Sequence, residues 1–379
     1  MLSRLRTALR GELEAPIADQ KIGRGWVSGV FALVLSLAGL VAVLCIRFPE
    51  LLTAPEIRSA IALPLWRIAT HALLIGGFLL ATVSLVLRDS KVLGLTSVTA
   101  VLIALACGGS MAQDSSNLSG RIYFGLDWFV LNLFLTGILF IPLERLFPRR
   151  PHPVFRTEWR EDLFYFFIAS ILIQSLTLLS LAPSKLIMAT AELGPVQKAI
   201  ANQPLILQFF EIMVLTDFVQ YWVHRIFHRV PFLWRFHAVH HSAQTLDWLA
   251  GSRMHLLEVV CLRGCTVIPM YVLGFSQPAL YAYLVVVYLY ATYVHSNLKF
   301  DIEWLKPFIV TPRFHHWHHG IEKEAIDVNF AVHFPIFDRL FGTYYMPPGR
   351  WPSGYGVSET VPGGFVRQFL YPFTPRSKS

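Results

Sequence analysis

Eight long apolar stretches dominate this chain of 379 residues, and each is about long enough to cross the hydrocarbon core of a bilayer. A segment inside a membrane must satisfy its backbone polar groups internally, so stretches of this length are expected to be helices. The sequence therefore predicts an all-α polytopic membrane bundle of about eight spans or half-spans. The stretches lie near residues 26–47, 65–87, 92–113, 124–145, 162–182, 205–223, 256–274 and 277–294.

The charged residues indicate orientation rather than nucleic-acid binding. Charged residues make up only 15% of the chain, and the net charge is +8. Basic residues precede the first stretch, and Arg149 and Arg150 follow the fourth, so both segments are expected in the cytoplasm. Because no soluble part gathers the positive charge, a nucleic-acid partner is not indicated. We expect a multi-pass protein with a cytoplasmic N-terminus, in a bacterial inner membrane in preference to the endoplasmic reticulum.

Histidines are concentrated in the second half of the chain. Eleven of the 14 fall between residues 224 and 319, on or beside segments that the span order places at the cytoplasmic face. Imidazole is the commonest ligand for transition metals, and the eight clustered rings exceed what one ion needs. We therefore predict a site for two metal ions at that face. The clusters are His224/His228 (first), His237/His240/His241 (second) and His315/His318/His319 (third).

The spacing within the clusters supports ligation. His224 and His228 are four residues apart, which places both rings on one face of a helix. Asp217 lies on the same stripe, inside an apolar stretch where a carboxylate needs a partner. We expect Asp217 to accept a hydrogen bond from the second ring nitrogen of a first-cluster histidine. An all-nitrogen ligand set suits two iron ions, although zinc can occupy such a site in a purified protein.

Three segments resemble the histidine boxes of the fatty acid hydroxylase superfamily in type, order and spacing. They are residues 217–228, 236–242 and 311–319. Asn329-Phe330 and residues 338–344 resemble the segment that closes this domain, so the resemblance covers about 160–345. Two departures are Leu256, where many members have proline, and Phe337, where tryptophan is common.

The resemblance implies an enzyme that uses O₂ and two iron ions to hydroxylate or desaturate a C–H bond of a fatty acyl, alkyl or sterol lipid. The clustered histidines would be the metal ligands, together with His255 and His295. Asp217, Glu258 and Asn329 would act at the site. Since the chain shows no haem or flavin domain, the resemblance also implies a separate electron donor of the ferredoxin or cytochrome b5 type.

The sequence suggests three regions: a four-span membrane region (1–150), a catalytic domain (151–346) and a proline-rich tail (347–379). The third cluster and residues 338–344 look closer to hydroxylases, so hydroxylation is the preferred reaction and desaturation the alternative. A metal-transport protein is disfavoured because transporters hold their ligands near the membrane midplane. A catalytically silent lipid-binding protein is disfavoured because all three boxes are intact.

Overall fold

The computed structural model describes residues 2–113, 123–190, 193–300, 302 and 304–374. Helices make up the regular structure of these residues, which contain no strand beyond two isolated bridges. The chain divides into two compact units, and one boundary between them in the sequence falls within the long helix α7 (Leu126–Leu146). The predicted all-α class is confirmed.

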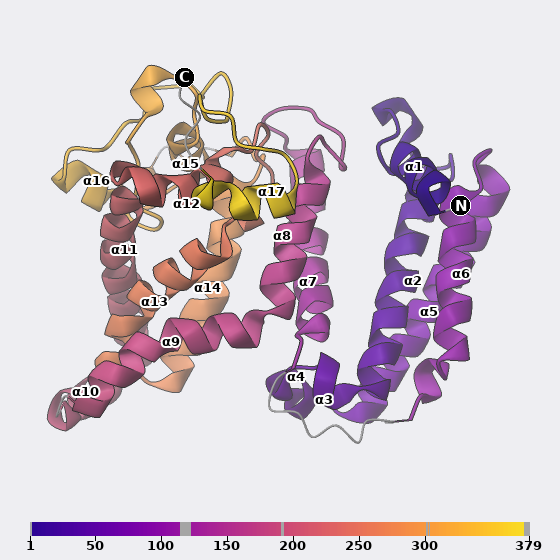
Figure 1. Cartoon of the computed structure of the whole chain (residues 1–379), viewed down its shortest axis with the longest axis horizontal. Coiled ribbons are helices and arrows are strands. Elements are labelled where there is room, and N and C mark those ends of the chain that lie inside the picture. The colour runs from indigo at the N-terminus through magenta and orange to yellow at the C-terminus, as the bar shows by residue number, and fades with distance from the viewer. Residues whose placement is uncertain (1, 114–122, 191–192, 301, 303, 375–379) are drawn as a thin grey trace. The chain divides into compact units, whose positions relative to one another are not determined.

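The first unit is built on three long apolar helices, in which α2 packs against α5 and α6 (Figure 1). Small residues allow this close approach. A Cβ added at Gly29 would lie 2.5 Å from Ser84 Oγ, and one at Gly77 would lie 2.5 Å from Ser36 Oγ. Small residues at helix contacts are typical of membrane bundles, where packing rather than the hydrophobic effect joins helices. The helices are α2 (Trp26–Arg47), α5 (Leu63–Leu87) and α6 (Val92–Ala106).

Fewer helices than predicted could cross a membrane unbroken. In the described chain, six are long and apolar enough, and a helix pair bent by 66° makes a seventh if the pair counts as one span. That pair, α8 (Trp159–Ile171) and α9 (Ile173–Thr190), replaces the predicted fifth span. The predicted seventh span is α13 (Leu256–Val272), which has only 17 residues and contains Pro269.

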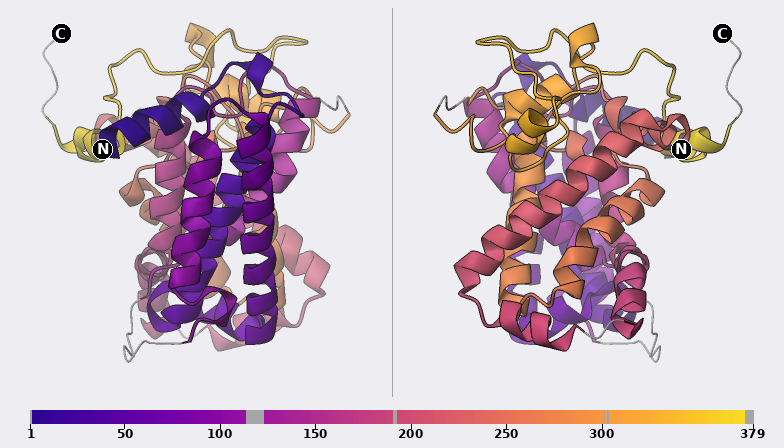
Figure 2. Two further views of the ribbon diagram at one scale, coloured as in Figure 1. Left: turned by 90° about the vertical axis from the view of Figure 1, so that its right-hand side faces the viewer. Right: turned by 90° about the vertical axis from the view of Figure 1, so that its left-hand side faces the viewer.

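The second unit is organised around α11, which packs against α12, α13 and α14. Helix α11 (Leu205–Arg229) and helix α14 (Gln277–His295) both end at the same end of this unit, beside α12 and α15 (Figure 1). The segments after α14 also gather there in both views of Figure 2. The remaining helices are α10 (Gly194–Ala201), α12 (Pro231–His241), α15 (Pro312–His318), α16 (Ile336–Leu340) and α17 (Phe365–Leu370).

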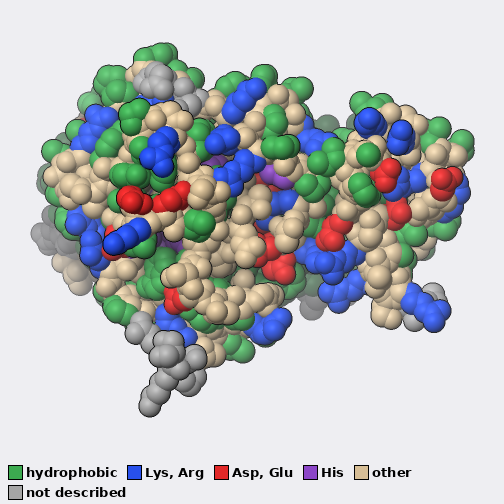
Figure 3. Space-filling view, turned by 90° about the horizontal axis from the view of Figure 1, so that it is seen from above, with side chains coloured by type: hydrophobic (Ala, Val, Ile, Leu, Met, Phe, Trp, Pro, Cys, Tyr) green, Lys and Arg blue, Asp and Glu red, His purple; other side chains and the backbone are tan. Residues whose placement is uncertain are grey.

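The C-terminal segment is attached to this end of the second unit. Trp317 Nε1–H donates to the carbonyl of Arg350 at 3.0 Å, and the Arg235 guanidinium donates to the carbonyl of Tyr371 at 2.6 Å. This proline-rich tail includes the short helix α17. Seen from outside, little histidine surface is visible at this end, in agreement with the burial of the clustered side chains (Figure 3).

Candidate metal centre

Four helices bring the histidines together, and the local sequence sets where each helix begins and ends. Helix α11 ends after its two histidines because Pro231 starts α12, and proline is well tolerated in the first turn of a helix. Helix α15 starts in the same way at Pro312, where the Thr311 hydroxyl accepts from the Phe314 N–H at 3.4 Å. His295 is the last residue of α14.

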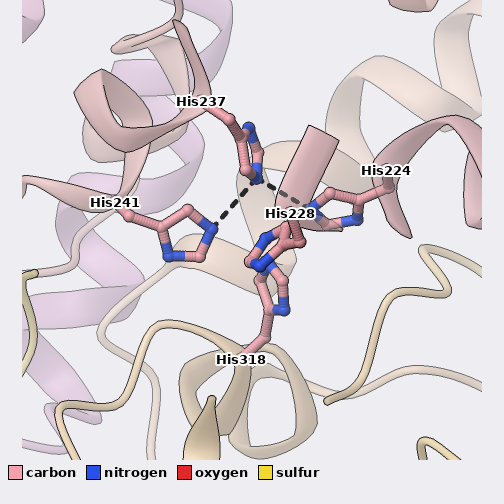
Figure 4. Close-up of side chains that lie close together, drawn as sticks. All are labelled: His224, His228, His237, His241 and His318. Atoms are coloured by element: carbon pink, nitrogen blue, oxygen red, sulfur yellow. Dashed lines mark hydrogen bonds between the residues drawn. The ribbon is translucent and has the colours of Figure 1, made fainter. Parts of the chain in front are cut away.

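The rings form two groups rather than three. Within each group, one nitrogen of every ring lies within 4.8 Å of those of the others. The second and third clusters are each divided between the groups. His237 and His241 are four residues apart and share one group, whereas His240 joins the other. Group one is His224, His228, His237, His241 and His318 (Figure 4), and group two is His240, His295, His315 and His319.

The hydrogen bonds of group one show which ring nitrogens are free to bind a metal. His224 Nδ1–H donates to the carbonyl of Phe330 at 2.9 Å, and His237 Nδ1–H donates to Glu258 Oε1 at 2.5 Å. A neutral imidazole has one N–H, so the Nε2 atom of each ring carries a lone pair. These two Nε2 atoms are only 2.9 Å apart, and a dashed line joins them in Figure 4. Two facing lone pairs need a cation to hold them together.

Group two shows the same arrangement. His240 Nδ1–H donates to the carbonyl of Arg253 at 3.0 Å, and His295 Nδ1–H donates to the carbonyl of Ala291 at 2.7 Å. The Nε2 atoms of these two rings therefore carry lone pairs that face each other, and the two atoms lie 3.2 Å apart. In group one, the Nε2 atoms of His228 and His318 are also buried without a hydrogen-bond partner. The donor sets of both groups thus fit a metal ion bound by neutral imidazoles.

Burial keeps these rings neutral. Six of the nine lie outside the membrane-spanning helices, and in each case burial lowers the pKa well below its ordinary value of 6.5. Neighbouring histidines lower it further, because a second positive charge in the same site is unfavourable. At neutral pH their lone pairs are therefore available to a metal. The six are His237, His240, His241, His315, His318 and His319.

Comparison with known proteins finds a family that matches the region containing both histidine groups. Residues 209–343 match the fatty acid hydroxylase family. The chain carries a fatty acid hydroxylase domain. This domain contains every histidine of both groups, so the resemblance seen in the sequence is confirmed.

Three curated relatives are similar to part of the chain. The ornithine lipid hydroxylase of Rhizobium tropici is 30% identical over 175 residues, which is 46% of this chain and 53% of the relative. Human alkylglycerol monooxygenase is 31% identical over 129 residues, covering 34% and 28%. A putative methylsterol monooxygenase of Dictyostelium discoideum is 30% identical over 134 residues, covering 34% and 47%. The chain thus spans about half or less of each relative, and no solved structure matches it.

Within the hydroxylase domain, Asp217 does not contact a first-cluster histidine. Its carboxylate accepts the backbone N–H groups of Val332, His333 and Phe334 at 2.8, 3.0 and 2.7 Å. The expected bond to a first-cluster imidazole is therefore wrong for Asp217, whose Oδ1 lies 3.5 Å from Nδ1 of His333 instead. Glu258 makes a carboxylate–imidazole bond in the metal groups, to His237. Asp217 instead anchors the segment that follows Phe330, whose carbonyl holds His224.

Two further residues that were expected at the site, His255 and Asn329, bond to backbone groups outside it. His255 lies outside both groups, because its Nδ1 accepts from the Leu257 N–H at 3.2 Å and its Nε2–H donates to the carbonyl of Phe369 at 3.0 Å. Asn329 has φ 59°, and its side-chain amide donates to the carbonyls of Phe314 and Tyr345. Neither side chain keeps a polar atom directed at the groups. By contrast, His295 does lie in group two, as expected.

Sequence reasoning missed one side chain and several carbonyls that hold the rings. Asp327, at φ 59°, places its carboxylate 3.4 Å from His228 Nδ1, and this contact lowers the pKa of Asp327. The carbonyl of Val328 accepts from His318 Nδ1–H at 2.8 Å. Backbone carbonyls leave no sequence signal. Asp327, however, stands two residues before Asn329 and could have been considered.

Proposed function

We propose that this chain is a membrane oxygenase that hydroxylates a C–H bond of a lipid, using O₂ and electrons from a separate donor. The observation that carries the proposal is the facing of Nε2 lone pairs in two buried groups, which calls for two cations. The fatty acid hydroxylase domain and its lipid hydroxylase and monooxygenase relatives support the lipid substrate.

The metal ions of this proposal are two irons, one in each group, with zinc as a substitute in purified protein. Bound there, they would supply the activation of O₂ that attack on a C–H bond requires. The chain's own residues fix the site around them. Glu258 and the carbonyls of Phe330, Arg253 and Ala291 hold four rings in the Nε2-ligating tautomer. Burial of the rings keeps water away from the centre.

The position of the groups suits a substrate that stays in the bilayer. Helices α11 and α14 are both candidate membrane spans, and each contributes metal-binding histidines at its C-terminal end. A lipid can therefore keep its apolar body in hydrocarbon while one carbon reaches the metals. In this proposal the site and the N-terminus face the cytoplasm of a bacterial inner membrane, where a ferredoxin or cytochrome b5-type donor can approach. Residues 1–150, 151–346 and 347–379 are then the membrane region, the catalytic domain and the tail.

Lipid mass spectrometry under ¹⁸O₂ tests this function. Cells that express the wild-type chain should accumulate a lipid with one labelled oxygen, and cells that express His240→Ala should not. A new double bond without label would identify the reaction as desaturation instead of hydroxylation. An unchanged lipid profile in the wild type, with two metals bound, would reject an oxygenase.

A further inference from the structure

Trp234, in helix α12, lies against group one and is partly exposed. Its ring centroid lies 4.9 Å from that of His228 and 5.5 Å from that of His241, two of the rings shown in Figure 4. Phe227 and Phe330 also contact rings of group one, but both are buried. Trp234 therefore connects the metal-binding rings of group one with the surface of the second unit.

The outer edge of Trp234 bonds to the C-terminal segment. Its Nε1–H donates to the carboxylate of Glu359, which is an exposed residue. The other carboxylate oxygen of Glu359 accepts from the Tyr371 hydroxyl at 3.1 Å. The guanidinium of Arg235 lies over the ring of Tyr371, 4.9 Å from its centroid. These contacts join four residues into one surface patch, called the α12 patch here: Trp234, Arg235, Glu359 and Tyr371.

Group one is less enclosed than group two. All four histidines of group two are buried, whereas His228 of group one is partly exposed. Nδ1 of His228 lies 3.4 Å from the carboxylate of Asp327, and the Asp327 side chain is itself 25% exposed. A protein that binds the surface of the second unit here therefore approaches group one, while group two lies behind it.

Contacting rings continue from Trp234 into group two. The ring of His241 stacks on that of His319 in group two, with centroids 4.3 Å apart and an angle of 27° between the planes. Trp234, His241 and His319 thus form a series of rings in contact, from the surface to both groups. Because the rate of electron transfer falls steeply as donor and acceptor separate, a series of contacting rings is a favourable route for electrons.

We propose that a one-electron carrier protein docks on the α12 patch and that Trp234 conducts its electrons to group one. Hydroxylation with O₂ requires two electrons and two protons from outside the lipid, because one oxygen atom enters the C–H bond and the other leaves as water. In each transfer the carrier loses one electron, and a ferric ion held by group one is reduced to the ferrous state. The stacked rings of His241 and His319 lead onward to group two. This inference rests on the proposed function and specifies where its electrons enter.

Stopped-flow reduction of the iron-loaded full chain, without O₂ and without lipid, tests the role of Trp234. The probes are reduced ferredoxin, reduced cytochrome b5 and dithionite, and the signal is the loss of ferric absorbance. With a protein donor that reduces the wild type, Trp234→Leu should lose most of the reduction rate but reach the same end point with dithionite. Trp234→Phe keeps a ring beside His228 and His241, so it should retain more of the rate. The control Trp304→Leu, which alters an exposed tryptophan elsewhere, should match the wild type.

Hydrogen exchange on the wild type tests the docking site without any electron transfer. The oxidised form of the donor that reduces the chain should protect backbone amides in residues 231–235 and 359–371. This measurement also decides the matter if Trp234→Leu fails to retain iron. Protection confined to other segments would reject the α12 patch as the docking site.

Three kinetic outcomes would likewise overturn the proposal. One is a Trp234→Leu variant that retains iron and is reduced by the protein donor as fast as the wild type, and another is an equal loss of rate in Trp304→Leu. The third is a wild type that dithionite reduces but neither protein donor does. Any of these, in a wild type that still incorporates ¹⁸O into a lipid, would reject the entry point and leave the proposed function standing.

Discussion

Replacing Glu258 by glutamine should weaken metal binding in group one. The Glu258 side chain is fully buried, and its Oε1 lies 2.5 Å from Nδ1 of His237, whose Nε2 faces the other rings of the group. Glutamine keeps the size and can still accept this hydrogen bond, but it cannot become a carboxylate, the charged acceptor that would make the imidazole a better ligand for a bound cation. A bond to a charged acceptor is roughly twice as strong as a neutral one.

The expected effect is a 10–100-fold loss of affinity in group one, the usual cost of altering a residue that orients a metal-bound histidine. This corresponds to about 1.4–2.7 kcal/mol of binding free energy. Folding should survive, because the second Glu258 oxygen is buried without a hydrogen-bond partner, so the amide loses no bond there.

Competition with a chromophoric chelator, on purified metal-loaded protein, measures this loss. The exposed Glu324→Gln variant is the matched control and should behave as the wild type. Release of one ion at a lower chelator concentration, with the second ion unaffected, is the predicted result. Equal retention of both ions in Glu258→Gln and Glu324→Gln would refute the assigned role of Glu258.

Three further predictions separate residues that hold the fold from residues that hold metal. Asp217→Asn should keep both ions but lower the thermal unfolding temperature, because an amide cannot accept hydrogen bonds from all three backbone N–H groups that the carboxylate accepts. Loss of an ion in this variant would show that Asp217 supports metal binding after all. His255→Ala should likewise retain both ions in elemental analysis while destabilising the contact of α13 with the C-terminal segment, and a loss of metal would count against this. Because burial lowers the pKa of the ligand histidines, protons should displace metal only as pH falls below 6.5, and half-release at or above pH 6.5 in a pH titration of bound metal would disagree.

The sequence predicted those features of the site that depend on local periodicity. The spacing of histidines along a helix determines which rings lie on the same face, so the clustering of metal-binding rings is visible before the fold is known. The length of the apolar stretches similarly predicts a helical membrane bundle. Neither signal shows where a continuous apolar stretch will bend, and α8 and α9 bend by 66° within one such stretch.

Contacts between distant segments were not predictable. Asp217 and Glu258 are both buried acids close to histidines in sequence or space, and the sequence favoured the first. Which of them bonds to a metal-binding histidine depends on the segment 331–334, whose backbone N–H groups donate to the Asp217 carboxylate. The carbonyls of Phe330 and Arg253, which fix two ring tautomers, come from loops and have no side-chain signature.

The most direct test of the two-metal centre is the metal content of the full chain purified from iron-supplemented cells, with one variant for each group. His237→Ala removes a ring of group one and His319→Ala removes a ring of group two. The account predicts two ions per wild-type chain and the loss of a different one in each variant, which X-ray absorption can distinguish by the remaining ligand set. One ion per wild-type chain, or wild-type content in both variants, would contradict it.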